Sequence, residues 1–284
     1  MLRGQVWSDE VWRYEVRCHE VWCDEKMRPD GKIASKMRPG QKMKIQMQAD
    51  LVEQSRLAAA AASFLDVVTE LYTAERNAVT DLIGDAPFTQ WDHFPPRDFY
   101  DAQTGALFFY HAHDPAERHN GEHGHFHCFV ERSRIEPAAV PIYQPAPQDG
   151  TKPLCHIIAV SIDMNGLPTE LFTTNQWVTG ECFYPAEAVI ALIDSFSFPG
   201  SRDSSLVSRW LADLVALFRP QIMQLLVQRD ANLGINRKSR SKLRSRSIDV
   251  VSNWQSMLMS RLQTYLFRVS RDYCGCQLST NVQL

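Results

Sequence analysis

The stretch "ALFFYHAHDPAERHNGEHGHFHCFVE", residues 106–131, decides how the middle of the chain folds. Both of its ends are rich in aromatic residues and alternate in polarity, which is typical of β-strands. A polar segment of nine residues, 114–122, separates the two ends. We therefore expect strands over 106–113 and 123–131, joined as an antiparallel hairpin. Six of the nine histidines of the chain also lie in this stretch, so the hairpin is the first place to look for chemistry.

The alternation of side chains along a strand predicts where these histidines point. His111 and His113 share one face of the first strand, and His123, His125 and His127 share one face of the second. If His113 pairs with His123, then His111 pairs with His125, and all five imidazoles gather on one face of the sheet. A slip of one residue in the register would place the two sets on opposite faces.

Such a cluster is difficult to explain by packing alone, because imidazoles titrate near pH 6.5 and protonated rings repel one another. A bound cation uses the lone pairs, and imidazole suits zinc, iron, copper and nickel. We therefore predict a divalent transition metal as cofactor, held by His111, His113, His123, His125 and His127. Further candidate ligands are Glu122, Glu131, His156, Asp92 and His93. A metal-free acid–base cluster and a solvated polar hairpin remain as alternatives.

The histidine-rich region resembles sequences of two known families. The pattern His125-x-His127-x-x-x-Glu131 resembles the first half of the cupin metal motif, in which His156 would be the later histidine. The sequence departs from cupins because no well-spaced Pro-x-Gly-x-x-His follows. The segments WDHFPP, YHAH and GEHGHFHxF together are similar to an uncharacterised bacterial domain family, a domain of unknown function, over about residues 57–230. That resemblance implies no activity, and it implies that both ends of the chain are appendages.

The remaining patterns predict the fold class. Strands are expected over 154–163 and 169–178, and an aromatic, proline-rich stretch, 88–105, is expected to be an ordered loop. Helices are expected from Asp50 to Gly84 and over 184–196, 204–218 and 220–230. The predicted fold is α+β: a short antiparallel sheet of about four strands, packed with a long N-terminal helix and C-terminal helices.

Charge divides the chain into three parts. Residues 50–230 contain 24 acidic and 11 basic residues, a net charge of −13, whereas residues 1–49 carry +3 and residues 231–284 carry +7. Residues 6–25 form four pentapeptides, and a period of five matches neither a helix nor a strand. We expect 1–49 to be a disordered, repeat-like leader, 50–233 the folded histidine-rich domain, and 234–284 a basic linker with an amphipathic helical tail.

Composition limits the classes of function. The acidic middle repels nucleic acid, so nucleic-acid contact is expected only through the basic stretch 237–246. No apolar run approaches the roughly 18 residues of a membrane helix, no signal peptide is visible, and the scattered cysteines favour a cytoplasmic protein. The leading hypothesis is a metalloenzyme that acts on a small-molecule substrate through the histidine cluster. The alternative is a non-catalytic metal-binding, sensing or interaction domain with a structural metal.

Overall fold

The computed structural model describes residues 39–118, 121–146, 152–199, 205–235, 242–255, 260 and 262–264. The chain divides into two compact units, residues 1–56 and 57–284. The described part of the first unit is the N-terminal portion of helix α2, which runs from Pro39 to Thr73. The second unit holds the rest of α2, the sheet and all the other described elements. The predicted pentapeptide repeat, residues 237–241 of the basic stretch, and most of the C-terminal tail lie outside the described residues.

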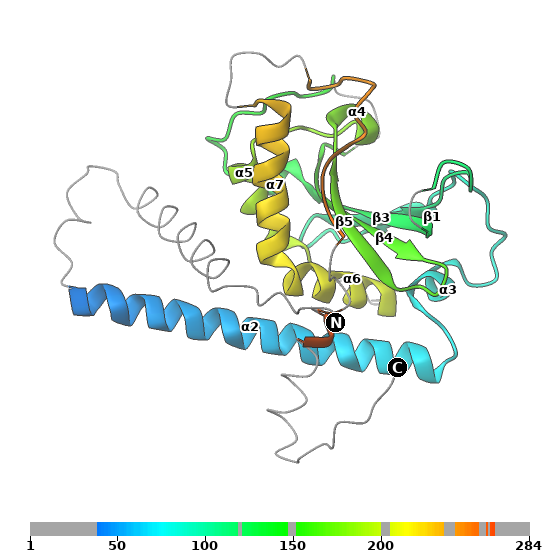
Figure 1. Cartoon of the computed structure of the whole chain (residues 1–284), viewed down its shortest axis with the longest axis horizontal. Helices are drawn as coiled ribbons and strands as arrows, with labels where there is room; N and C mark the ends of the chain where they lie inside the picture. Colours follow the sequence, from blue (N-terminus) through cyan, green and yellow to red (C-terminus); the bar gives the residue numbers. More distant parts are fainter. Residues whose placement is uncertain are drawn as a thin grey trace, which may run out of the picture. The chain divides into compact units, whose positions relative to one another are not determined.

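A single antiparallel sheet of six strands forms the centre of the second unit, and each strand pairs with its neighbours in sequence order (Figure 1). The strands are β1 Phe94–Tyr100, β2 Ala106–His111, β3 Glu122–Glu131, β4 Leu154–Asp163, β5 Pro168–Thr174 and β6 Val250–Trp254. The predicted α+β class and antiparallel sheet are confirmed. The expected count of about four strands is wrong, because β1 and β6 add one strand at each edge.

The two missed strands lack a clear strand signal in the sequence. Strand β1 contains two prolines, which lack a backbone N–H donor and are tolerated in edge strands, and its pairing with β2 shifts register between Phe94 and Phe99. Strand β6 was expected to begin an amphipathic helix. It instead pairs with β5, where Leu171 faces Trp254 and Thr173 faces Ser252.

Helices cover one face of the sheet and build the main core there. They are α3 Ala78–Ile83, α5 Ala186–Ile190, α6 Leu206–Leu217, α7 Arg219–Leu233 and the part of α2 that follows Arg56. Two 3₁₀ turns, Arg132–Arg134 and Ile193–Ser195, and the short α4, Gln176–Thr179, complete the described elements. Phe108 and Phe126 point toward this side, and Phe126 lies 5.8 Å from the ring of Trp210. By alternation, the odd-numbered residues of β2 occupy the opposite face.

The long N-terminal helix differs from the expectation at both ends. Helix α2 begins at Pro39, within the segment expected to be a leader, so Asp50 lies inside the helix and does not cap it. The helix ends at Thr73, and Glu75 adopts a left-handed conformation with φ of 55°. Asn77 then caps the separate helix α3, because its side chain accepts hydrogen bonds from the backbone of the next turn.

The described part of the basic stretch packs on the sheet domain. Arg244 lies 4.5 Å over the ring of Tyr143, and Arg246 lies 4.6 Å over the ring of Trp177. The amide of Asn175 donates a hydrogen bond to the backbone oxygen of Lys242. Residues 242–246 are therefore bound to the domain and are not a free solvated linker.

Among the described helices, none is by itself long and apolar enough to cross a membrane. Helices α6 and α7 pass that test only when taken together, and they are bent by 72° relative to each other.

Candidate metal centre

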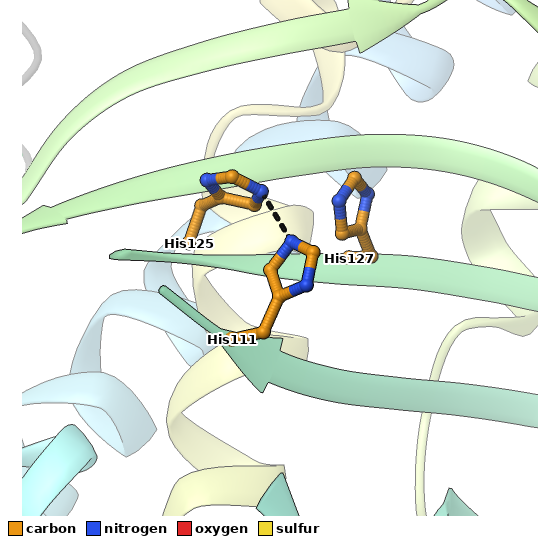
Figure 2. A group of neighbouring side chains, drawn as sticks. All are labelled: His111, His125 and His127. Atoms are coloured by element: carbon orange, nitrogen blue, oxygen red, sulfur yellow. Dashed lines mark hydrogen bonds between the residues drawn. The ribbon is translucent and has the colours of Figure 1, made fainter. Parts of the chain in front are cut away.

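The register of the hairpin brings His111 of the first strand next to His125 and His127 of the second. In the pairing of β2 with β3, His111 faces His125 and Phe109 faces His127. One ring nitrogen each of His111, His125 and His127 lies within 4.8 Å of the others, so these three residues can hold a metal ion. The Nε2 atoms of His111 and His125 are 2.7 Å apart, and the ring of His127 stands beside them (Figure 2). Alternation and register thus place three of the five predicted ligands at one point.

The cluster is shielded from water by aromatic neighbours. The side chains of His125 and His127 are buried, and His111 is half-buried. The ring of Phe172, from β5, lies 5.3 Å from the ring of His125, and the ring of Phe109 lies 5.2 Å from that of His127. One side of the cluster therefore faces the apolar surface of the sheet, and the side at His111 is accessible.

Burial favours the neutral form of two of the three imidazoles by lowering the pKa of His111 and of His127. Burial, together with the neighbouring histidines, lowers the pKa of His111 to about 2. Burial also holds the pKa of His127 well below its usual value, with His125 and His156 contributing. A ligating imidazole must be neutral, because only the deprotonated nitrogen offers a lone pair. His111 and His127 are therefore in the protonation state that a metal requires.

Two polar side chains contact the cluster without belonging to the group of three. The carboxylate of Glu122 lies 2.6 Å from Nδ1 of His125. Burial alone would raise the pKa of Glu122, but its hydrogen bonds to His125 and Ser161 bring the pKa below its usual value. The buried His156 places its Nε2 atom 3.1 Å from Nδ1 of His127. Burial and the charge of Arg229 lower the pKa of His156 to about 3.

His113 lies beside the cluster but beyond the end of β2. Its ring is 5.1 Å from that of His111 and 5.0 Å from that of His125. It stacks at 4.2 Å on the exposed ring of Trp91, whose backbone is in the left-handed region with φ of 68°. His113 therefore occupies the accessible side of the cluster, next to the three converging nitrogens.

His123 does not join the cluster. Its Nδ1 atom lies 2.5 Å from the hydroxyl of Tyr110, and its ring lies 5.3 Å from that of Phe88, on the helix-covered face. The pairing of β3 with β4 shifts register between Glu122 and Gly124, and such a bulge inserts one residue that reverses the alternation. The expectation that His123 points the same way as His125 is therefore wrong, and Glu122 takes the place that alternation gave to His123.

The other candidate ligands lie outside the group of three. Glu131 is at the far end of β3, where its carboxylate accepts a hydrogen bond from the hydroxyl of Tyr100. The exposed His93 stacks on Phe109 with the ring centres 3.7 Å apart, and its Nδ1 atom lies 2.9 Å from the carboxylate of Asp98. Asp92 is exposed. The partner of His93 is therefore Asp98 and not its sequence neighbour Asp92.

Sequence reasoning missed the neighbours that other strands supply. Phe172 reaches the cluster because it pairs with Ala159 of β4, and Ser161 reaches Glu122 because it pairs with His125. Thr174 lies 3.5 Å from Nδ1 of His156 through the same sheet. Their positions depend on the registers of β4 and β5, for which the sequence offered no signal comparable to the paired histidines.

The spacing of the three ring nitrogens can be compared with that of a tetrahedral metal site. With zinc-to-nitrogen distances of about 2.0–2.1 Å, two ligand nitrogens of a tetrahedral site lie about 3.3 Å apart. The 2.7 Å between Nε2 of His111 and Nε2 of His125 is slightly shorter, so a metal would separate this pair by a small movement of the rings. Three protein ligands leave one coordination position for water or another ligand.

Comparisons with known proteins identify a family but no function. A family model described as "Domain of unknown function (DUF6969)" matches residues 58–255. No curated protein and no solved structure matches the chain. The matched residues extend from α2 through β6, so they include all six strands and the histidine cluster.

Proposed function

The chain belongs to the family of the domain of unknown function DUF6969, and from the chemistry of its site we propose that it is a metal-binding protein whose cofactor is a divalent transition metal. The observation that carries the proposal is the convergence of ring nitrogens of His111, His125 and His127 within 4.8 Å. Each ring is held by its strand, and none of the three offers a soft thiolate or a hard carboxylate. An all-imidazole site suits zinc, iron, copper or nickel and disfavours magnesium and calcium.

We propose further that the site is catalytic and acts on a small-molecule substrate. Catalytic zinc sites have three protein ligands and an open position, whereas structural sites have four. A bound metal would supply Lewis acidity or an activated water at that position. Within the chain, His113 lies on the accessible side, where it is placed to exchange a proton with a metal-bound group.

The competing proposal is a closed metal site with a structural or sensing role. It is supported by the position of His113, whose ring centre lies 5.0 Å from that of His125, which makes His113 the candidate for a fourth ligand. In that case the metal would have no exchangeable position. The two proposals differ in whether a small ligand can bind to the metal, and this binding can be measured.

The protein expressed without a histidine tag should copurify with about one equivalent of a transition metal per chain, measured by inductively coupled plasma mass spectrometry. After exchange to Co(II), azide should change the visible absorption spectrum, because it occupies the open position. A spectrum that azide leaves unchanged, and that changes in His113→Ala, would identify the closed site. A protein that neither copurifies with a metal nor takes up Zn(II), Co(II), Ni(II) or Cu(II) would exclude both proposals.

A further inference from the structure

Two polar contacts determine which nitrogen each buried histidine presents to a metal. A neutral imidazole carries its hydrogen on one nitrogen and its lone pair on the other. A ligand that is to present Nε2 must therefore hold the hydrogen on Nδ1, and a hydrogen-bond acceptor next to Nδ1 fixes that tautomer. The structure places such an acceptor beside two of the three candidate ligands.

The first acceptor is Glu122. Its Oε1 atom lies 2.6 Å from Nδ1 of His125, and a carboxylate oxygen accepts a hydrogen bond, so Nδ1 of His125 donates. Nε2 of His125 is then left to face His111, from which it is 2.7 Å away. Glu122 reaches this position only because of the bulge at His123, which turns the side chain of residue 122 to the histidine face.

The second acceptor is His156. Its Nε2 atom lies 3.1 Å from Nδ1 of His127, and its own Nδ1 atom lies 3.5 Å from the hydroxyl of Thr174. If Nε2 of His127 holds the metal, its Nδ1 carries the hydrogen and donates it to His156. His156 then carries its hydrogen on Nδ1, beside the hydroxyl of Thr174. A register shift between Cys128 and Phe129 sets His156 opposite Phe129, where its ring reaches His127.

We infer that Glu122 and His156, which the sequence marked as candidate ligands, are instead positioning residues that fix the Nδ1–H tautomers of His125 and His127 and so direct both Nε2 atoms to the metal. This inference rests on the proposed metal site. The negative charge of Glu122 also offsets part of the charge of a divalent ion bound to three neutral imidazoles. Loss of such outer partners costs about 10- to 100-fold in metal affinity, whereas loss of a ligand removes a coordination bond and changes the spectrum.

The first test uses the full chain and zinc alone, with affinity measured by competition with a chromophoric chelator. Glu122→Ala should weaken zinc binding by about 10- to 100-fold. Glu122→Gln should restore most of the affinity, because the amide oxygen still accepts from Nδ1. The matched control is Glu131→Ala, which removes a carboxylate from the other end of β3, where it contacts Tyr100 and no histidine. His156→Leu should weaken binding in the same way, and His156→Gln should restore it.

The second test reads the tautomers directly. Long-range ¹⁵N–¹H NMR spectra of the metal-free protein should show the hydrogen of His125 on Nδ1 in the wild type and in Glu122→Gln. In Glu122→Ala the Nδ1–H tautomer of His125 should no longer be favoured over the Nε2–H tautomer. The Co(II) spectrum of Glu122→Ala should keep the wild-type band shape, since no ligand is lost.

Three results would overturn the inference: equal zinc affinity in Glu122→Ala and Glu131→Ala, no recovery in Glu122→Gln, or a changed Co(II) coordination spectrum in Glu122→Ala. The last would make Glu122 a ligand. If the wild-type protein binds no zinc, the proposed function fails; if the wild type binds zinc and these variants behave like the control, only the positioning role fails.

Discussion

At the scale of single residues, burial controls the charge of the site. Buried histidines such as His127 and His156 have strongly lowered pKa values because desolvation disfavours the imidazolium. In the unfolded chain the same side chains take up a proton near pH 6.5. The folded metal-free protein therefore binds fewer protons than the unfolded chain at acidic pH, and its stability depends on pH.

The stability of the metal-free protein should be fully present above about pH 6.5 and should fall as the pH is lowered toward the folded-state pKa of each histidine. Each such histidine contributes a slope that rises from about half of 1.4 kcal/mol per pH unit at pH 6.5 to nearly the full value below about pH 5.5. Urea unfolding at pH 7.5, 6.5 and 5.5 measures the slope. In His156→Gln, the loss of stability between pH 6.5 and 5.5 should be smaller by about 1 kcal/mol, because the unfolded histidine is only partly protonated over this range. An unchanged slope would show that His156 is protonated in the folded protein.

At the scale of elements, a bulge in β3 determines which side chains lie on each face of the hairpin. Gly124 makes it possible, because a Cβ atom there would contact the backbone oxygen of His111 and the hydroxyl of Tyr110 at closer than ordinary distances. The close approach lets Tyr110 reach His123 on one face while Glu122 reaches His125 on the other. The bulge therefore connects the packing of the strand to the composition of the site.

The variant Gly124→Ala should lower the stability by about 1–3 kcal/mol, since overpacking forces the backbone of β2 away from β3. It should also weaken zinc binding, because His111 and His125 approach each other across this pair of strands. Thermal unfolding monitored by circular dichroism and zinc competition measure the two effects. If the variant has the melting temperature and the zinc affinity of the wild type, the strands accommodate the added methyl group without loss of stability. The close approach at Gly124 then does not position the site.

The two strands of the hairpin were predictable from their alternating aromatic residues. The histidines restricted the register to two alternatives, and the structure has the one that sets His111 opposite His125. The orientation of His123 was not predictable, because a bulge depends on how β4 pairs with β3 and leaves no period in the sequence. A close approach such as that at Gly124 is visible in a sequence only as a glycine inside a strand.

At the scale of the whole molecule, the sheet joins segments that are distant in sequence. Strand β6 pairs with β5, and the hydroxyl of Ser252 donates to the backbone oxygen of Leu225 in α7 while lying 2.6 Å from that of Thr173. Strand β6 therefore belongs to the domain although it lies beyond residue 233, where the sequence suggested that the domain ends. The family match likewise extends to residue 255. Local patterns could not reveal β6, since its partners lie about 80 residues earlier.

The same architecture links the metal to the stability of the fold. The three candidate ligands come from β2 and β3 in the middle of the sheet, so a metal that binds them binds the folded state and not the unfolded chain. At a zinc concentration about 100 times the dissociation constant, such binding adds about 2.7 kcal/mol to the free energy of unfolding. The stabilisation by zinc is therefore a direct readout of the site.

The most direct test of the metal site compares two histidines of the same strand, His125 and His123, by thermal unfolding of the full chain with and without zinc. Zinc should raise the melting temperature of the wild type and of His123→Ala by similar amounts, because His123 points to the helix-covered face. It should produce little or no increase in His125→Ala, which lacks a central ligand. An equal zinc-induced increase in His125→Ala and the wild type, or loss of the increase in His123→Ala alone, would contradict the assignment of the metal to His111, His125 and His127.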